Sequence, residues 1–320
     1  MKNQMIHTTL AAFLAGASFL PVTLPNLAAA AESPFAVRMN TMEIDGLTIA
    51  YREAGDPSNP TVLLLHGFPT SSHMFRELIP ELAGKYHVIA PDYPGFGASD
   101  MPDVKDYDYS FANAADVVTK LIEASGVTDY AVYLMDYGAP VGYRMFAADP
   151  ARVTGFIIQN GNAYEEGLRE FWDPIKTYWA EPSAENGDAL RAFLTLDATI
   201  WQFTHGVGDV SKVNPDNYWH VQYLLDRPGN QEVQLEMFLD YGTNVSEYPK
   251  WQALFREHQP PALIVWGQND HIFPAQGAHP YKQDLTDVEF HLLDTGHFAL
   301  EEYGEVIADE MTDFLDRIHD

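Results

Sequence analysis

The chain has 320 residues, of which 46% are hydrophobic and 20% charged, the composition of a globular protein with a large core. Its formal net charge of −28 repels phosphate backbones and anionic lipid head groups, which argues against nucleic acid as a partner. Because the chain contains no cysteine, disulfides, a lipid-modified cysteine and thiolate-rich metal sites are excluded.

Residues 1–31 predict an export signal. Lys2 precedes a short apolar run, and an Ala-rich end with an A-x-A-like cleavage site near Ala30 or Ala31 follows it. The alternative is a membrane anchor, but the run over residues 8–22 contains small and polar residues and is shorter than the roughly 20 needed to span a bilayer. We therefore expect a secreted or periplasmic protein without a membrane anchor.

After this leader, short aliphatic runs alternate with longer amphipathic segments, which predicts a mostly parallel sheet flanked by helices. The expected strands are residues 42–53 (a hairpin around Asp45-Gly46), 61–65, 87–91, 130–135, 153–159, 262–266 and 288–293. The expected helices are residues 112–125, 139–149 and 303–318, where apolar residues recur every three or four positions.

Residues 161–248 break this alternation. They are rich in Trp, Tyr and Phe, contain no good strand, and include EEGLREFWDPIKTYWAE and NYWHVQYLLDRP. We expect a helical cap here, inserted between two parts of the core, residues 32–160 and 249–320. Its aromatic side chains suit the lining of a pocket, although most of them can equally pack the interior of the cap itself.

The segment VYLMDYGAPVGYRMF joins a buried strand to a helix through Asp136. Gly138 and Ala139 are small enough to let this turn tighten into a nucleophile elbow, with Asp in the place usually held by Ser. A carboxylate at this tip is ionised at neutral pH, is favoured by the helix N-terminus behind it, and can attack an sp3 carbon directly. The alternative for Asp136 is an ordinary helix N-cap.

Two later segments supply an acid and a base in the order expected after a nucleophile. ALIVWGQNDHIF ends a strand with Asp270 in the loop, and VEFHLLDTGHFALEE places His297 between a late strand and the final helix. We expect His297 to act as the base and Asp270 to orient it. Asp294 and His271 are rivals whose positions fit less well.

The segment TVLLLHGFPTSSHMF places His66-Gly67-Phe68-Pro69 directly after a strand. The backbone N–H of Phe68 can there join that of Tyr137 to form an oxyanion hole. We expect His66 to hold the loop rather than to carry a proton. The Gly-rich turn PDYPGFGASD lacks the Gly-Lys-Ser/Thr ending of a phosphate loop.

Together these motifs resemble the α/β-hydrolase superfamily over nearly the whole mature chain, and within it the Asp-nucleophile branch of epoxide hydrolases and haloalkane dehalogenases. The resemblance implies an α/β-hydrolase fold with an inserted helical lid. It also implies an alkyl ester on Asp136, hydrolysed by water that His297 activates while Asp270 holds the imidazole tautomer. Such an enzyme needs no cofactor or metal; its partners are a small apolar substrate and water, and a homodimer is left open.

The resemblance points to leaving-group residues in the cap. FLDYGTNVSEYP resembles the segment that carries the second lid tyrosine of epoxide hydrolases, here Tyr241, and IKTYWAE points to Tyr178 as the first. Trp179 is the alternative, as a halide-binding residue. The distinction matters because an epoxide opens to an alkoxide that must be protonated, whereas a halide needs only hydrogen-bond donors.

Some positions depart from these families. Haloalkane dehalogenases usually have Trp after the nucleophile and often Asn after His-Gly, where this chain has Tyr137 and Phe68. Fluoroacetate dehalogenases carry arginines after the Asp, but Tyr137 and Pro140 stand here, which argues against a haloacid substrate. Leu134, two residues before Asp136, occupies a position where the superfamily commonly has Gly.

The function expected from the sequence is therefore that of an epoxide hydrolase, which converts an apolar epoxide to a vicinal diol. The alternative is a haloalkane dehalogenase. Hydrolysis of esters or lactones is less favoured, because carboxylate attack on an ester yields an anhydride. A non-catalytic binding protein of the same fold is the rival from another class, and it requires Asp136, Asp270 or His297 to be misplaced.

Overall fold

The computed structural model describes residues 36–319 of the chain. The predicted export signal, residues 1–31, lies outside the described residues. Among the residues that are described, no helix is both long and apolar enough to cross a membrane.

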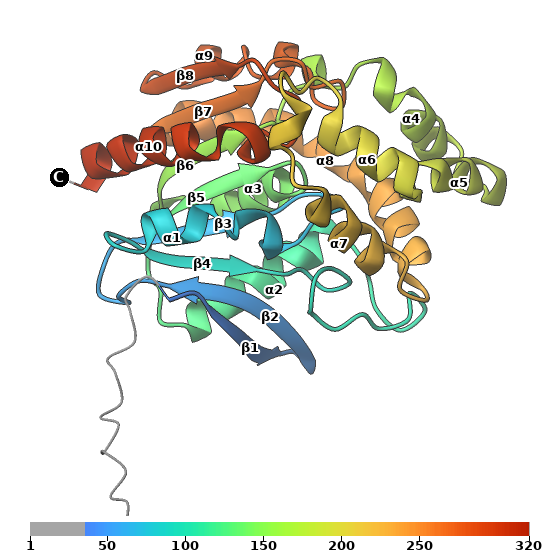
Figure 1. Ribbon diagram of the computed structural model, residues 1–320, viewed down its shortest axis with the longest axis horizontal. Coiled ribbons are helices and arrows are strands. Elements are labelled where there is room, and N and C mark those ends of the chain that lie inside the picture. The colour runs from blue at the N-terminus through green and yellow to red at the C-terminus, as the bar shows by residue number, and fades with distance from the viewer. Residues whose placement is uncertain (1–35, 320) are drawn as a thin grey trace, which may run out of the picture. The chain divides into compact units, whose positions relative to one another are not determined.

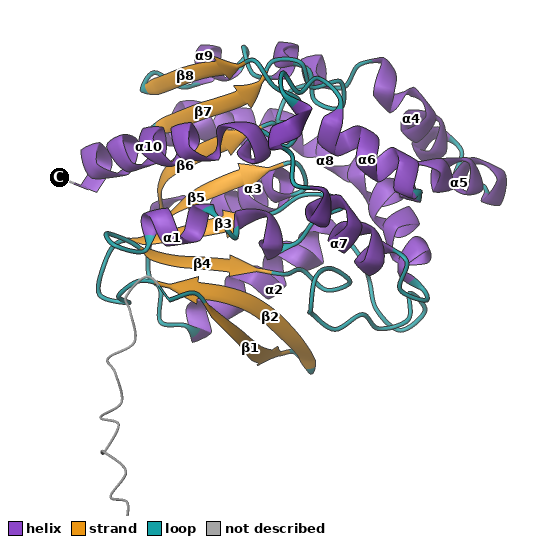
Figure 2. Ribbon diagram, in the orientation of Figure 1, coloured by secondary structure: helices purple, strands orange, loops and turns teal. Residues whose placement is uncertain are grey.

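The described residues contain one sheet of eight strands in the order β1-β2-β4-β3-β5-β6-β7-β8 (Figures 1 and 2). The strands are β1 (Arg38–Ile44), β2 (Leu47–Ala54), β3 (Thr61–Leu65), β4 (His87–Pro91), β5 (Tyr130–Met135), β6 (Val153–Gln159), β7 (Ala262–Gly267) and β8 (Val288–Leu293). β1 and β2 form an antiparallel hairpin, β2 is antiparallel to β4, and the pairs from β4 to β8 are parallel. The carboxyl ends of six strands therefore meet at one edge.

Local sequence explains these strands. The hairpin turns at Asp45 and Gly46, whose φ angles of 51° and 83° suit the turn that matches strand twist, and Asp and Gly tolerate them. Strands β3, β5 and β7 are buried along their whole length, as their uninterrupted apolar sequences require when helices cover both faces of a sheet. The edge strand β8 is partly exposed.

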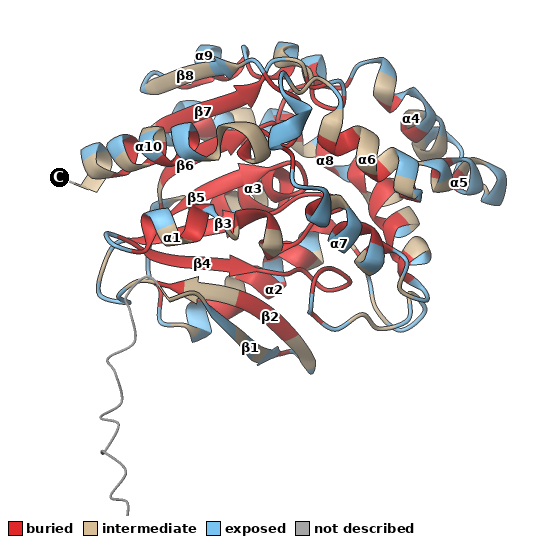
Figure 3. Ribbon diagram, viewed as in Figure 1, coloured by how far each residue is buried: buried red, intermediate tan, exposed pale blue. Residues whose placement is uncertain are grey.

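Helices cover both faces of the sheet. Helices α2 (Phe111–Ala124) and α3 (Gly138–Ala148) pack against one set of alternating strand residues, and α1 (Leu78–Leu82) and α10 (Leu300–His319) pack against the other. The short α9 (Tyr281–Asp284) precedes β8. The central strands are buried, whereas α10 exposes its outer side (Figure 3). This arrangement confirms the predicted fold class, a mostly parallel sheet flanked by helices.

The segment between β6 and β7 is helical and contains no described strand. Its helices are α4 (Asp173–Ala180), α5 (Ala184–Leu190), α6 (Leu196–Thr204), α7 (Pro215–Leu225) and α8 (Asn230–His258). The predicted end of the cap at residue 248 falls inside α8. This helix continues because its later residues Trp251 and Phe255 are buried against Tyr143 of α3, with ring centroids 5.4 and 5.1 Å away.

Candidate active site

Asp136 lies at the tip of the turn between β5 and α3, at the carboxyl edge of the sheet. Its φ angle of 51° is in the left-handed region that non-glycine residues seldom adopt. The tight turn depends on neighbours without side chains: a Cβ on Gly138 would lie 2.3 Å from the carbonyl oxygen of Leu65. A Cβ on Gly67 would lie 2.3 Å from the Cβ of Asp136 itself. These glycines therefore allow the elbow that the sequence predicted.

Leu134 fits this elbow although a smaller residue was expected there. A Cβ on Gly142 of α3 would lie 2.2 Å from Cδ2 of Leu134, so the side chain of Leu134 occupies the space that this glycine leaves. The small residue is thus on the helix rather than on the strand, and α3 still packs closely behind Asp136.

Two backbone N–H groups hold one oxygen of the buried Asp136 carboxylate. Phe68 donates to Oδ1 at 2.7 Å, and Tyr137 donates to the same oxygen at 2.6 Å. These are the two donors that the sequence predicted for an oxyanion hole. The other oxygen, Oδ2, lies 3.7 Å from Nε2 of His297, so the carboxylate has one fixed oxygen and one that faces the imidazole.

Asp270 fixes the tautomer of His297. Its Oδ2 lies 2.7 Å from Nδ1 of His297, and since a carboxylate only accepts hydrogen bonds, Nδ1 carries the proton. The lone pair is then on Nε2, which has no hydrogen-bond partner among the described residues and faces Asp136. Asp270 also accepts from the backbone N–H of Ile272 at 2.7 Å. The structure thus brings together the predicted nucleophile, base and acid.

Asn160 is a supporting residue that the sequence analysis missed. It follows β6 with a φ angle of 45°, and its Nδ2 donates to Oδ2 of Asp270 at 2.7 Å. Its Oδ1 accepts the backbone N–H of Gly267 at 2.9 Å. Asn tolerates the left-handed region better than most residues. A polar residue directly after a buried parallel strand was the signal that could have identified it.

The ionisation of the site follows from its burial and its charges. Burial raises the pKa of Asp136 to about 6, although His297 and the two backbone N–H groups oppose this rise. Burial lowers the pKa of His297, but the carboxylates of Asp270 and Asp136 outweigh it, so that pKa lies above its ordinary value. At neutral pH the site therefore contains an ionised Asp136 beside a readily protonated base.

The rival acid and base lie elsewhere. Asp294 is exposed and accepts from Nδ2 of Asn269 at 2.9 Å, and His271 is exposed with its ring against that of His205. His66 is buried, and burial lowers its pKa to about 4, so it is neutral and bonds to the carbonyl of Gly67 at 3.1 Å. This agrees with the structural role expected for His66.

The Gly-rich turn after β4 binds its own carboxylate. Asp92 accepts the backbone N–H groups of Ser72 and Ala98 at 2.7 and 2.8 Å. From the cap, Arg227 donates to the carbonyls of Gly95 and Gly97. Asp92 therefore ties the Gly-rich turn to the loop that contains Ser72, and Arg227 joins the turn to the cap.

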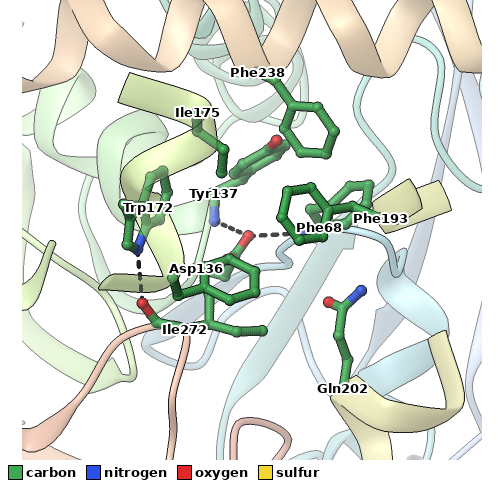
Figure 4. A pocket seen from close by; sticks show the side chains of 10 residues that line it. Phe68, Asp136, Tyr137, Trp172, Ile175, Phe193, Gln202, Phe238 and Ile272 are labelled. Atoms are coloured by element: carbon green, nitrogen blue, oxygen red, sulfur yellow. Dashed lines mark hydrogen bonds between the residues drawn. The ribbon is translucent and has the colours of Figure 1, made fainter. Parts of the chain in front are cut away.

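A narrow cavity of about 20 Å³ borders Asp136 (Figure 4). Its walls are mostly aromatic and aliphatic, and are formed by Phe68, Asp136, Tyr137, Phe171, Trp172, Ile175, Phe193, Gln202, Phe238 and Ile272. Within this wall, the indole N–H of Trp172 donates a hydrogen bond to the carbonyl oxygen of Ile272 at 2.7 Å. The side-chain amide of Gln202 makes no hydrogen bond with another residue in the described part of the chain, and Figure 4 draws none between it and the other residues of the wall.

The three predicted leaving-group residues do not line this cavity. Tyr241 lies one layer behind the wall, with its ring centroid 4.5 Å from Trp172 and 6.0 Å from Tyr137. The buried hydroxyl of Tyr241 makes no hydrogen bond of ordinary geometry with the described residues. Burial raises the pKa of Tyr241, and the nearby hydroxyl of Tyr248 adds to this rise.

Trp179 and Tyr178 are used within the cap. Trp179 donates its indole N–H to the carbonyl of Phe238 at 2.7 Å and stacks parallel to Tyr241. Tyr178 lies beside Gly187 of α5, where a Cβ would be 3.3 Å from its ring. The cap residues on the wall are instead Phe171, Trp172, Ile175, Phe193, Gln202 and Phe238. Ile175 opens the segment IKTYWAE that suggested Tyr178, and Trp172 lies three residues before it.

Comparison with known proteins agrees with this geometry. The family model described as "alpha/beta hydrolase fold" matches residues 60–303. An uncharacterized hydrolase of Saccharomyces cerevisiae, YNR064C, is 44% identical over 271 residues, covering 83% of this chain and 93% of its own. A haloalkane dehalogenase of Mesorhizobium japonicum is 38% identical over 286 residues, covering 85% of this chain and 89% of its own.

Solved structures show the same fold at lower identity. Cfl2 of Burkholderia cenocepacia has a TM-score of 0.73 at 23% identity, covering 87% of this chain and 95% of its own. A loop variant of the haloalkane dehalogenase DbeA of Bradyrhizobium elkanii has a TM-score of 0.70 at 20% identity, covering 88% of this chain and 98% of its own. The chain belongs to the α/β-hydrolase family, in its dehalogenase-like branch, and is a hydrolase.

Proposed function

We propose that the protein hydrolyses small apolar alkyl halides to alcohols through an alkyl ester on Asp136. One observation carries this proposal. A buried carboxylate has Oδ1 held by two backbone N–H groups and Oδ2 beside an imidazole that Asp270 orients, and it borders a largely apolar cavity. The haloalkane dehalogenase of Mesorhizobium japonicum among its relatives supports a halide as leaving group.

In the first half-reaction, Oδ2 of Asp136 attacks the carbon that carries the halogen. The carbon–oxygen bond forms as the carbon–halogen bond breaks, and the halide leaves with the bonding electron pair. The two N–H groups on Oδ1 leave Oδ2 as the nucleophilic oxygen. No general base is required, because Asp136 is already ionised at neutral pH.

In the second half-reaction, Nε2 of His297 takes a proton from water, and the water oxygen adds to Cγ of Asp136. Negative charge then develops on Oδ1, where Phe68 and Tyr137 already donate. Breakage of the bond between Cγ and the ester oxygen regenerates the Asp136 carboxyl group, which still carries the second proton of the water and releases it to solvent to restore the carboxylate. The proton held by His297 passes to the departing alkoxide, and the alcohol is released.

The charge of Asp136 links the two half-reactions. The Asp136 carboxylate is one of the groups that raise the pKa of His297. Ester formation neutralises Asp136, so it removes that contribution and lowers the pKa of His297. Ester formation therefore shifts the imidazole toward its neutral form at the stage when water must be deprotonated, while Asp270 continues to raise its pKa.

The leaving group is chosen by the donors of the cavity. The expectation of an epoxide substrate rested on Tyr178, Tyr241 and the loop His66-Gly67-Phe68-Pro69, which resembles the epoxide hydrolase form. Phe68 of this loop lines the cavity, whereas neither tyrosine is part of its wall. An alkoxide needs an acid that gives up its proton, whereas a halide needs only donors. Epoxide hydrolysis remains the second candidate because Tyr241 lies directly behind Trp172 and Tyr137 and a side-chain rearrangement could expose its hydroxyl.

The test is a panel of short bromoalkanes and terminal epoxides, with released halide, alcohol and diol measured for the wild type and for Asp136→Asn. We expect halide and alcohol in equal amounts from the wild type and none from the variant. Diol from epoxides without halide from bromoalkanes would replace the proposal by the second candidate. No product from either class would overturn the ester mechanism.

A further inference from the structure

Gln202 is an unused polar group on the wall of the cavity. It lies on α6 of the cap, is only 5% exposed, and lines the same narrow cavity as Asp136. Its amide makes no hydrogen bond with another described residue, and it is not among the unpartnered groups that are sealed from open space. A buried amide without a partner is costly, so one that persists at a cavity indicates a ligand group there.

The other donors near the cavity are already used or enclosed. The indole N–H groups of Trp172 and Trp179 donate to backbone carbonyls, and the N–H groups of Phe68 and Tyr137 donate to Asp136. The Tyr137 hydroxyl lacks a partner among the described residues but is fully enclosed. Within residues 36–319, the amide of Gln202 is thus the side-chain donor on the cavity wall that remains free.

The helix that carries Gln202 is fixed against the core. Phe203, the next residue, stacks on Phe298 with ring centroids 4.2 Å apart, and Phe298 directly follows His297. Thr199, one turn earlier, donates to Oε1 of Gln222 on α7 at 2.7 Å. Gln202 is therefore held near the reacting groups by its neighbours, as an orienting donor requires.

We infer that the side-chain amide of Gln202 binds the departing halide, in the place of the Trp and Asn that this chain lacks after Asp136 and after His66-Gly67. This inference rests on the proposed function. The chemistry of an amide fits that leaving group: its N–H groups donate to an anion but do not give up a proton, which stabilises a halide and does not serve an alkoxide. The other cap residues of the wall are aromatic or aliphatic and strengthen such a contact by excluding water.

Direct halide binding tests the inference without turnover. Sodium bromide is titrated at constant ionic strength into Asp136→Asn, which carries a neutral side chain as the ester does, and tryptophan fluorescence is followed because Trp172 lines the cavity. We expect saturable binding, weakened about 10- to 100-fold by Gln202→Leu, the loss typical of a hydrogen bond to a charged group. Gln231→Leu is the matched control, since Gln231 is a cap glutamine outside the cavity that accepts from Arg191. Its bromide affinity should not change.

Turnover gives the second readout. In the otherwise wild-type enzyme, Gln202→Leu should lower the rate of ester formation with both a bromoalkane and its chloro analogue. The rate should fall more with the chloroalkane, because chloride is the poorer leaving group. Gln202→Glu should be at least as impaired, because it replaces the donor by an anion. The rate of ester hydrolysis should stay within about threefold, since His297 and Asp270 are untouched.

The outcomes separate this inference from the proposed function. Bromide binding that Gln202→Leu leaves unchanged overturns the inference even if the wild type releases halide, and Tyr137→Phe then tests the rival donor. Saturable binding that depends on Gln202, in a protein that releases no halide, overturns the proposed function but retains the anion site. If bromide binds neither to Asp136→Asn nor to the same protein with Gln202→Leu, the inference is overturned.

Discussion

The two sides of the cavity are held in different ways. On the sheet side, Asp136, Asp270 and His297 follow the carboxyl ends of parallel strands, and backbone groups or buried carboxylates fix their atoms. On the cap side, ring packing and carbonyl contacts position Trp172 and Trp179. The sheet thus fixes the three residues that the proposed ester chemistry uses, while the proposed function assigns the choice of leaving group to the cap.

The largest effect should come from the sheet side. Asp136→Asn removes the nucleophile and should lower turnover by at least about 10⁴-fold. The same change should stabilise the protein at pH 7. The folded-state pKa of Asp136 is raised to about 6, so the folded chain binds more protons than the unfolded chain between about pH 4 and 6, and ionisation costs stability above that window.

That cost is about 3 kcal/mol at pH 7, and urea unfolding of the two proteins measures it. The gain should disappear at pH 4, where Asp136 is protonated in the folded chain. An unchanged or lowered stability of Asp136→Asn at pH 7 would contradict a desolvated carboxylate on the sheet side.

The acid limb of activity should be the next largest effect. Ester formation needs ionised Asp136, so its rate should fall about tenfold for each pH unit below about 6. Ester hydrolysis needs neutral His297, whose pKa is raised, so it also slows toward acid pH. Single-turnover rates from pH 4 to 9 measure both steps. Full activity at pH 4.5 would show that the carboxylate titrates normally.

Asn160→Ala should have an intermediate effect. It leaves the N–H of Gly267 without its acceptor, removes one donor from Asp270, and places Ala at a left-handed φ. We expect a loss of about 2–4 kcal/mol in the free energy of unfolding and about tenfold in ester hydrolysis. Asn269→Ala, in the loop that carries Asp270, is the control and should change hydrolysis less than threefold. Equal losses in both variants would argue against a role of Asn160 at the site.

The smallest effect should come from the cap tyrosines. Tyr178→Phe and Tyr241→Phe remove hydroxyls that do not line the cavity, so dehalogenation should change less than about threefold. Kinetics with a bromoalkane and with an epoxide check this. A collapse of epoxide turnover in Tyr241→Phe would show that this hydroxyl reaches the substrate and would favour the second candidate.

The difference between the two sides also explains what the sequence could predict. Strands β3 to β6 and β8 have the predicted bounds because they are short, apolar and bordered by turn residues. Asp136, Asp270 and His297 could be placed because the ends of parallel strands share one edge. The cap residues that line the cavity could not be identified in this way. Tyr178, Trp179 and Trp172 lie close in sequence, and only the packing of helix against helix decides which of them faces the cavity.

The features that the sequence did not predict also depend on contacts between distant parts of the chain. Gln202 has no motif and is identified by its unpartnered amide, and Asn160 by its contact with Asp270. Helix α8 passes the predicted boundary because burial of Trp251 and Phe255 continues it through Pro249. Such contacts join residues far apart in the chain, and local periodicity does not contain them.

Mass spectrometry of His297→Gln after exposure to a short bromoalkane tests the central claim most directly. Without the base, ester formation should continue while hydrolysis stops, so the intact mass should rise by one alkyl group, and the peptide that contains Asp136 should carry it. Asp136→Asn treated in the same way should gain no mass. A His297→Gln protein that stays unmodified while the wild type releases halide, or that is alkylated at another residue, would contradict the account.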